Sequence, residues 1–117
     1  MAAHNELGRI GELLGLCWLL GQKFEIIYTN WKHAKVEVDI IAKKSSILHF
    51  IEIKSRSNNN FGFPEESVSE KKIQNIKIAA EEFLFQFPEW KRIQFDVLSI
   101  TISNRKNVEF FFIEDIY

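Results

Sequence analysis

The sequence predicts an α/β or α+β domain in which two helices pack on a mixed β-sheet. Its 117 residues suffice for one domain, 1–117, and 46% hydrophobic with 14% aromatic residues can fill a sizeable core. The hydrophobic pattern alternates along the chain between the helical period and the strand period. The predicted order is helix, three strands, helix, two strands, which favours a sheet with helices packed on it.

The first helix is predicted over residues 5–21. Its second half is apolar almost all round, which is typical of a helix buried against a sheet. Cys17 lies in this stretch, and we expect it to fill the core rather than to react. Gly21 can end the helix from the position after its last turn.

Three strands are predicted next, at residues 24–30, 36–42 and 47–54. Each is a short run rich in β-branched or aromatic residues. The connection at 43–46 is short enough for a hairpin, so the second and third strands are expected to be antiparallel neighbours.

A loop, a second helix and two strands complete the chain. Residues 57–68 show no periodicity and predict the loop. Ser69 is expected to cap a helix that runs to about Phe87, because Pro88 disfavours its continuation. The two closing strands are predicted at residues 92–102 and 108–113.

Charge and targeting signals exclude several classes of protein. Fifteen basic against sixteen acidic residues give a net charge of −1, whereas a protein that merely coats nucleic acid is usually more basic. A single cysteine excludes an intrachain disulfide. The start lacks the pattern of a signal peptide, and the apolar stretch at 13–20 is too short to span a bilayer. We therefore expect a cytoplasmic protein with no membrane partner.

Polar residues in the two strands of the predicted hairpin form the candidate site. Alternation places Glu37 and Asp39 on one face of their strand, and Glu52 and Lys54 on one face of the next. If the register brings Asp39 opposite Glu52, a hard divalent cation would relieve the repulsion. Asp39, Glu52, the main-chain carbonyl of Ile53 and water would suit Mg²⁺ or Mn²⁺, with Lys54 beside the ion. The alternative is a pair of solvated carboxylates, but the apolar surroundings of Glu52 make an unpaired charge expensive.

These residues resemble a known motif. Asp39 followed by Glu52-Ile53-Lys54 is similar to the PD-(D/E)XK nuclease superfamily motif, whose Asp and Glu bind metal and whose Lys assists the attacking water. Val38 stands where the wider superfamily has Pro. The chain as a whole resembles the YraN family of small bacterial proteins, described as endonuclease-like and related to archaeal Holliday-junction resolvases. Segments that carry this likeness are 8–12, Asn30, 37–42, 50–56, 61–62, 64–65, 67–68, Lys72 and 95–97.

The resemblance implies a fold and an activity. The fold would be the restriction-endonuclease-like αβββαβ core, a mixed central sheet flanked by helices, which agrees with the predicted element order. The activity would be that of an Mg²⁺- or Mn²⁺-dependent endodeoxyribonuclease acting on branched or otherwise structured DNA. The alternative is a nucleic-acid- or protein-binding module that keeps the fold without turnover. Symmetric cleavage needs two sites, so a homodimer is also expected, with Trp90 or Phe110 at its interface.

Further residues receive roles from the same resemblance. Glu12 would complete the metal ligands, as a Glu of the first helix does in resolvase-like relatives. Neighbouring glycines would allow the sheet to approach this helix closely. The alternative is an ordinary surface Glu. Lys72 resembles the additional Lys near the scissile phosphate, and Arg56 is a candidate phosphate contact if its strand continues. Either could instead be an ordinary surface residue. Asp96 is assigned a structural role, and His49 is expected to be a strand residue with a satisfied partner.

Overall fold

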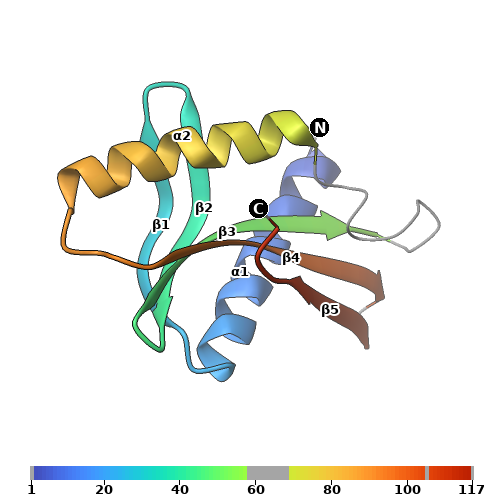
Figure 1. Ribbon diagram of the computed structural model, residues 1–117. Coiled ribbons are helices and arrows are strands. Elements are labelled where there is room, and N and C mark those ends of the chain that lie inside the picture. The colour runs from blue at the N-terminus through green and yellow to red at the C-terminus, as the bar shows by residue number, and fades with distance from the viewer. Residues whose placement is uncertain (1, 58–68, 105, 117) are drawn as a thin grey trace.

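The computed structural model describes residues 2–57, 69–104 and 106–116, with side chains from Glu6 onward (Figure 1). The element order is the predicted one, and the fold is α/β. Apart from Ser57, the loop expected at 57–68 lies outside the described residues. The elements are α1 (Ala2–Gly21), β1 (Glu25–His33), β2 (Val36–Lys44), β3 (Ile47–Arg56), α2 (Glu70–Gln86), β4 (Ile93–Asn104) and β5 (Asn107–Ile113).

The five strands form one mixed sheet in the order β1-β2-β3-β4-β5. β3 and β4 are parallel and are connected through α2, whereas the other neighbouring pairs are antiparallel. The predicted hairpin of β2 and β3 is therefore confirmed. Figure 1 shows α2 crossing one face of the sheet and α1 lying behind the other, with their N-terminal ends at the same end of β3.

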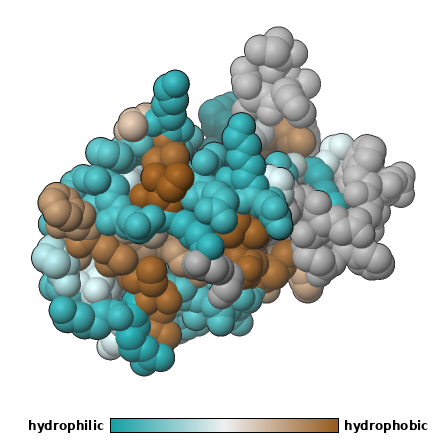
Figure 2. Space-filling view, turned by 45° about the horizontal axis from the view of Figure 1, so that its top comes forward, coloured by the Kyte–Doolittle hydropathy of each residue, from teal (hydrophilic) through white to brown (hydrophobic). Residues whose placement is uncertain are grey.

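Helix α2 begins and ends as predicted. The Ser69 side chain accepts a hydrogen bond from the main-chain N–H of Lys72 at 3.2 Å, and the helix stops at the Phe87 C-cap. Its buried face joins Phe50 in one core cluster, the α2-side cluster. On its outer face Ile78 and Phe85 are exposed, and Figure 2 shows hydrophobic residues separated by hydrophilic ones rather than one continuous apolar surface. The buried helix residues are Ile76, Ala79, Ala80 and Phe83.

Helix α1 lies close against β3 through two glycines. A Cβ atom on Gly11 would lie 1.7 Å from the Oγ of Ser55, and one on Gly15 would lie 2.8 Å from the Cδ1 of Ile53. Larger residues would therefore push the helix off the sheet. The expected close approach is observed, but side chains of β3 make it. Leu19 and the other core residues on this face form the α1-side cluster.

Helix α1 packs against the sheet as predicted, but the apolar residues on its other side are not buried. Leu13 and Leu20 are 55% and 56% exposed, and Cys17 is exposed instead of filling the core. The helix packs mainly on β3, and to a lesser degree on β1 and β4, so the sheet covers one side of it. None of the helices in the described part of the chain is long and apolar enough to cross a bilayer.

Two aromatic residues expected at a dimer interface pack within the chain. Trp90 is half-buried against the α2-side cluster. Phe110 stacks on Trp18 with ring centroids 5.8 Å apart, and both rings pack against the α1-side cluster. These contacts give both aromatics a role in the core of a single chain.

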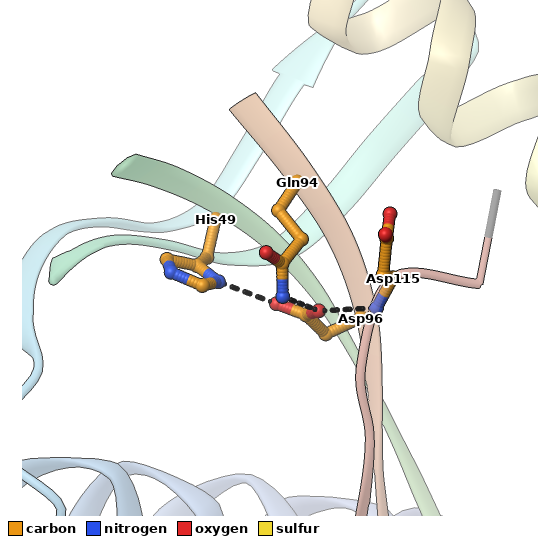
Figure 3. A network of polar contacts seen from close by, with 4 residues as sticks. All are labelled: His49, Gln94, Asp96 and Asp115. Atoms are coloured by element: carbon orange, nitrogen blue, oxygen red, sulfur yellow. Dashed lines mark hydrogen bonds and ion pairs between the residues drawn. The ribbon is translucent and has the colours of Figure 1, made fainter. Parts of the chain in front are cut away.

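A buried carboxylate joins β3, β4 and the C-terminal segment (Figure 3). Asp96 is fully buried, and its Oδ2 lies 2.7 Å from the Nδ1 of His49. Its Oδ1 accepts from the Nε2 of Gln94 at 2.8 Å and from the main-chain N–H of Asp115 at 2.9 Å. Because a carboxylate only accepts, the Nδ1 of His49 carries the hydrogen. The structural role expected for Asp96 and the satisfied partner expected for His49 are both observed.

Candidate functional site

Asp39 and Glu52 meet where β2 and β3 stop pairing. The last ladder pair at this end is Ile40 with Ile51, and Asp39 and Glu52 are the next residues in the same register. Beyond this point the main-chain N–H of Ile53 donates to the Oδ2 of Asp39 at 2.8 Å. The side chain of Asp39 thus takes the place of a main-chain acceptor, and the structure brings together the two carboxylates that the hairpin pattern suggested.

Side-chain alternation along β2 breaks at Asp39. Val38 packs in the α2-side cluster, whereas Ile40 packs in the α1-side cluster. In a regular strand these two residues would share a face, as the sequence pattern predicted, so that prediction is wrong here. The break leaves Asp39 at a point that both faces of the sheet reach. It lines one pocket on each side.

The pocket on the α2 side, the α2-side pocket, has a volume of about 410 Å³ and combines three lysines with three carboxylates. Each lysine and carboxylate comes from β2, β3, the turn before β2 or the first turn of α2. Both charge signs in one concave surface suit a phosphate and a cation together. These charged residues are Lys35, Lys71, Lys72, Glu37, Asp39 and Glu52, joined by Ser69 and Asn75.

Lys72 is the cation that contacts the carboxylates. Its Nζ donates to the Oε2 of Glu52 at 2.5 Å, and Glu52 is only 6% exposed. Burial alone would lower the pKa of Lys72, but the hydrogen bond and charge of Glu52, with the charges of Asp39 and Glu37, raise it overall. Lys72 therefore stays protonated and balances part of the buried negative charge.

Asp39 carries a strongly shifted carboxyl group. Its pKa is raised from 3.8 to about 7, chiefly by burial and next by the charge of Glu52. The hydrogen bond from Ile53 opposes this shift, Glu12 adds to it, and Lys72 lowers it again. In the metal-free protein Asp39 thus titrates near neutral pH, so proton release would accompany the binding of a cation.

We expect Asp39→Asn to stabilise the metal-free protein at alkaline pH. The pKa of Asp39 is about 7 in the folded protein and 3.8 in the unfolded chain, so ionising Asp39 opposes folding. The stability that protonated Asp39 contributes is fully present below pH 3.8 and is lost as the pH rises through about 7. Asn stays neutral and can still accept the Ile53 N–H. In urea unfolding, the free energy of unfolding of Asp39→Asn should exceed that of the parent by roughly 1–3 kcal/mol at about pH 8, and this difference should vanish at about pH 4.

The matched control for this prediction is Glu37→Gln, which removes an exposed carboxylate lining the same pocket. In Glu37→Gln, the difference in unfolding free energy between the two pH values should be the same as in the parent. A parent protein as stable as Asp39→Asn at alkaline pH would contradict the prediction.

Glu12 approaches the pair from α1. It is half-buried, lines the pocket on the α1 side together with Asp39, and raises the pKa of that residue. Across the described residues, however, no three His, Cys, Asp or Glu side chains are grouped closely enough to hold a metal ion. The oxygen donors of Asp39 and Glu52 fit a hard divalent cation held by two carboxylates, with water or substrate supplying the remaining ligands.

Lys54 and Arg56 lie further along β3. The strand continues to Arg56, so alternation places both side chains on the face of Glu52, and both are half-buried. Their parallel neighbours on β4 are Ser99 and Thr101. Neither residue lines the two pockets that meet at Asp39. The ammonium group that contacts Glu52 belongs to α2 instead.

The structure adds residues that the motif did not indicate. Lys35 lines the α2-side pocket from the turn before β2, and Asn75 lines it from α2. Lys71 is exposed and also borders this pocket. Helical spacing could have indicated Asn75, which follows Lys72 by three residues. No signal in the sequence singles out Lys35.

Comparisons with known proteins place the chain among relatives. The profile of the uncharacterised protein family UPF0102 matches residues 11–100, which include every candidate site residue. A UPF0102 protein of Flavobacterium psychrophilum is 37% identical over 100% of this chain and 98% of its own length. Others, from Flavobacterium johnsoniae and Dictyoglomus thermophilum, are 39% and 41% identical over 97% and 86% of this chain, and over 93% and 86% of their own lengths. The chain therefore belongs to the UPF0102 family, the YraN family that its motifs resemble.

Proposed function

We propose that this protein is a metal-dependent endodeoxyribonuclease that hydrolyses phosphodiester bonds. The observation that carries the proposal is the pairing of two carboxylates, half-buried Asp39 and buried Glu52, at the point where β2 and β3 separate. Lys72 pairs with Glu52, while burial and the charge of Glu52 raise the pKa of Asp39. A site that holds excess negative charge out of water is suited to a divalent cation.

The candidate residues divide into two groups by role. Asp39 and Glu52 would hold Mg²⁺ or Mn²⁺, with Glu12, the carbonyl of Ile53 or water completing the ligands. The ion would supply Lewis-acid activation of the phosphodiester when bound.

The basic residues act on the phosphate and the water. Lys54 orients the attacking water and counters charge that develops on the phosphate, while Arg56 and Lys72 bind phosphate oxygens. Such an enzyme acts on DNA in the cytoplasm, and the three lysines of the α2-side pocket are suited to the sugar-phosphate backbone. The resemblance to resolvases favours branched or structured DNA.

One observation favours the alternative, a binding module without turnover. The Lys72–Glu52 ion pair already neutralises one of the two ligands, and among the described side chains no third ligand completes the group. Such a module would bind branched DNA equally well with and without metal and would cleave none of it.

The first experiment is calorimetric titration of the protein with Mn²⁺, because it requires no knowledge of the substrate. We expect the parent to bind Mn²⁺, and Asp39→Asn and Glu52→Gln to lose at least about tenfold in affinity. Glu37→Gln is the control, since it removes a carboxylate from the same pocket without touching the proposed ligands. Branched, nicked and single-stranded DNA are then tested for cleavage in Mg²⁺ and in Mn²⁺.

Cleavage by the parent that is lost in both ligand variants would support the proposal. Cleavage of equal rate in the parent and in Asp39→Asn would refute the assignment of the site. Tight binding of branched DNA without cleavage in either metal would instead establish the binding module.

A further inference from the structure

Asp39 also borders a second pocket, the α1-side pocket, which differs in chemistry from the first. Its volume is about 350 Å³, at the lower end of the range of about 300–1,000 Å³ typical of small-ligand pockets. Leu13 and Leu16 of α1 and Ile40 of β2 form apolar walls, and besides Asp39 the charged side chains at this pocket are Arg9 and Glu12 of α1. The two pockets therefore present a charged surface on one side of Asp39 and a mainly apolar one on the other.

A local irregularity of β1 gives this pocket a polar rim. Thr29 pairs with Ile40 and Trp31 with Val38, but Asn30, which lies between, is not paired with Asp39. Asn30 adopts a positive φ of 52°, a left-handed conformation that Asn tolerates well, and it is exposed. Its amide can both donate and accept hydrogen bonds at the pocket edge.

We propose that the α1-side pocket receives an unpaired nucleobase next to the phosphate that lies at Asp39 and Glu52. This inference rests on the proposed function and names its substrate class, a DNA strand with at least one unstacked nucleotide at the site. A base is flat and apolar on its faces and polar along its edge. Leucine walls with an Asn and a Thr at the rim match that distribution.

The arrangement of the two pockets explains why the base must be unpaired. Both open at Asp39, so a phosphate at the carboxylates would have lysines on one side and the apolar walls on the other. A base within a duplex is stacked and paired, and it cannot enter a side pocket unless it leaves the stack. Single strands and single-stranded flaps provide such nucleotides at little energetic cost.

The test measures binding of fluorescently labelled single-stranded DNA by anisotropy, without metal, so that cleavage plays no part. Three probes are compared: the normal strand, the same strand with abasic sites, and a duplex. We expect the parent to bind the normal strand about fivefold or more tightly than the abasic strand. Leu13→Ala, and Asn30→Gly, which keeps the positive φ, should reduce binding of the normal strand to the abasic level.

Leu20→Ala is the matched control, because Leu20 lies on the same helix, is 56% exposed against 55% for Leu13, and does not line the pocket. It should bind all three probes as the parent does. Equal binding of normal and abasic strands by the parent, or equal effects of Leu13→Ala and Leu20→Ala, would overturn the pocket proposal even if DNA is cleaved. Base-dependent binding with no cleavage in any metal would support the pocket and refute the nuclease.

Discussion

We expect Lys54→Ala to lose at least about 100-fold in DNA cleavage while binding Mn²⁺ within about twofold of the parent. Lys54 lies two residues beyond Glu52 on the same face of β3, but it makes no part of either pocket that meets at Asp39. In the proposed function it acts on water or on charge developing at the phosphate, rather than holding the ion. Single-turnover cleavage and calorimetry on the same preparations separate the two effects.

Lys72→Ala provides the comparison for this prediction. Lys72 contacts Glu52 directly, so its removal should free that carboxylate and raise Mn²⁺ affinity several-fold, since a competing cation is lost. The two lysine variants thus differ in metal binding even if both impair cleavage. Unchanged cleavage in Lys54→Ala would refute the role assigned to Lys54.

Asp96→Ala is expected to be the most destabilising substitution of a polar residue outside the site. It leaves the Nδ1 of His49, the amide of Gln94 and the main-chain N–H of Asp115 without their shared acceptor. Removing one member of a buried hydrogen-bonded pair of this kind costs about 3–5 kcal/mol. Urea unfolding monitored by tryptophan fluorescence measures the loss.

Asp115→Asn is the control for Asp96→Ala. Asp115 is exposed, has a positive φ of 55° that Asn also tolerates, and takes part through its main-chain N–H, so this substitution should change stability by less than about 0.5 kcal/mol. Because the network lies toward the β2–β3 turn and away from Asp39, Mn²⁺ binding by the folded Asp96→Ala protein should equal that of the parent. A loss of stability below about 1 kcal/mol would show that the network contributes little.

Much of the fold could be read from local sequence patterns. The period of apolar residues indicated every helix and strand, a short connection indicated the β2–β3 hairpin, and Ser69 with Pro88 marked the ends of α2. These features depend on residues close together in the chain, where propensity, capping and turn length act directly. The spacing of Asp39 and Glu52 about one hairpin also belongs to this class, because the turn sets the register.

What the sequence could not determine depends on contacts between distant residues. Lys72 and Glu52 are 20 residues apart in the sequence, and Asp96 and His49 are 47 apart. No local sequence pattern indicates either contact. Burial of one side of α1 and exposure of Leu13 depend on how wide a surface the sheet offers, which periodicity does not encode.

The break in alternation at Asp39 has the same origin. Regular alternation puts Val38 and Ile40 on one face, but packing against both helices separates them and leaves Asp39 between two pockets. The sequence by itself determined the elements, the hairpin and the carboxylates that it carries. The tertiary structure alone decided that Lys72 is the basic side chain that contacts these carboxylates, and which pockets open beside them. Both depend on the packing of α1 and α2 against opposite faces of one sheet.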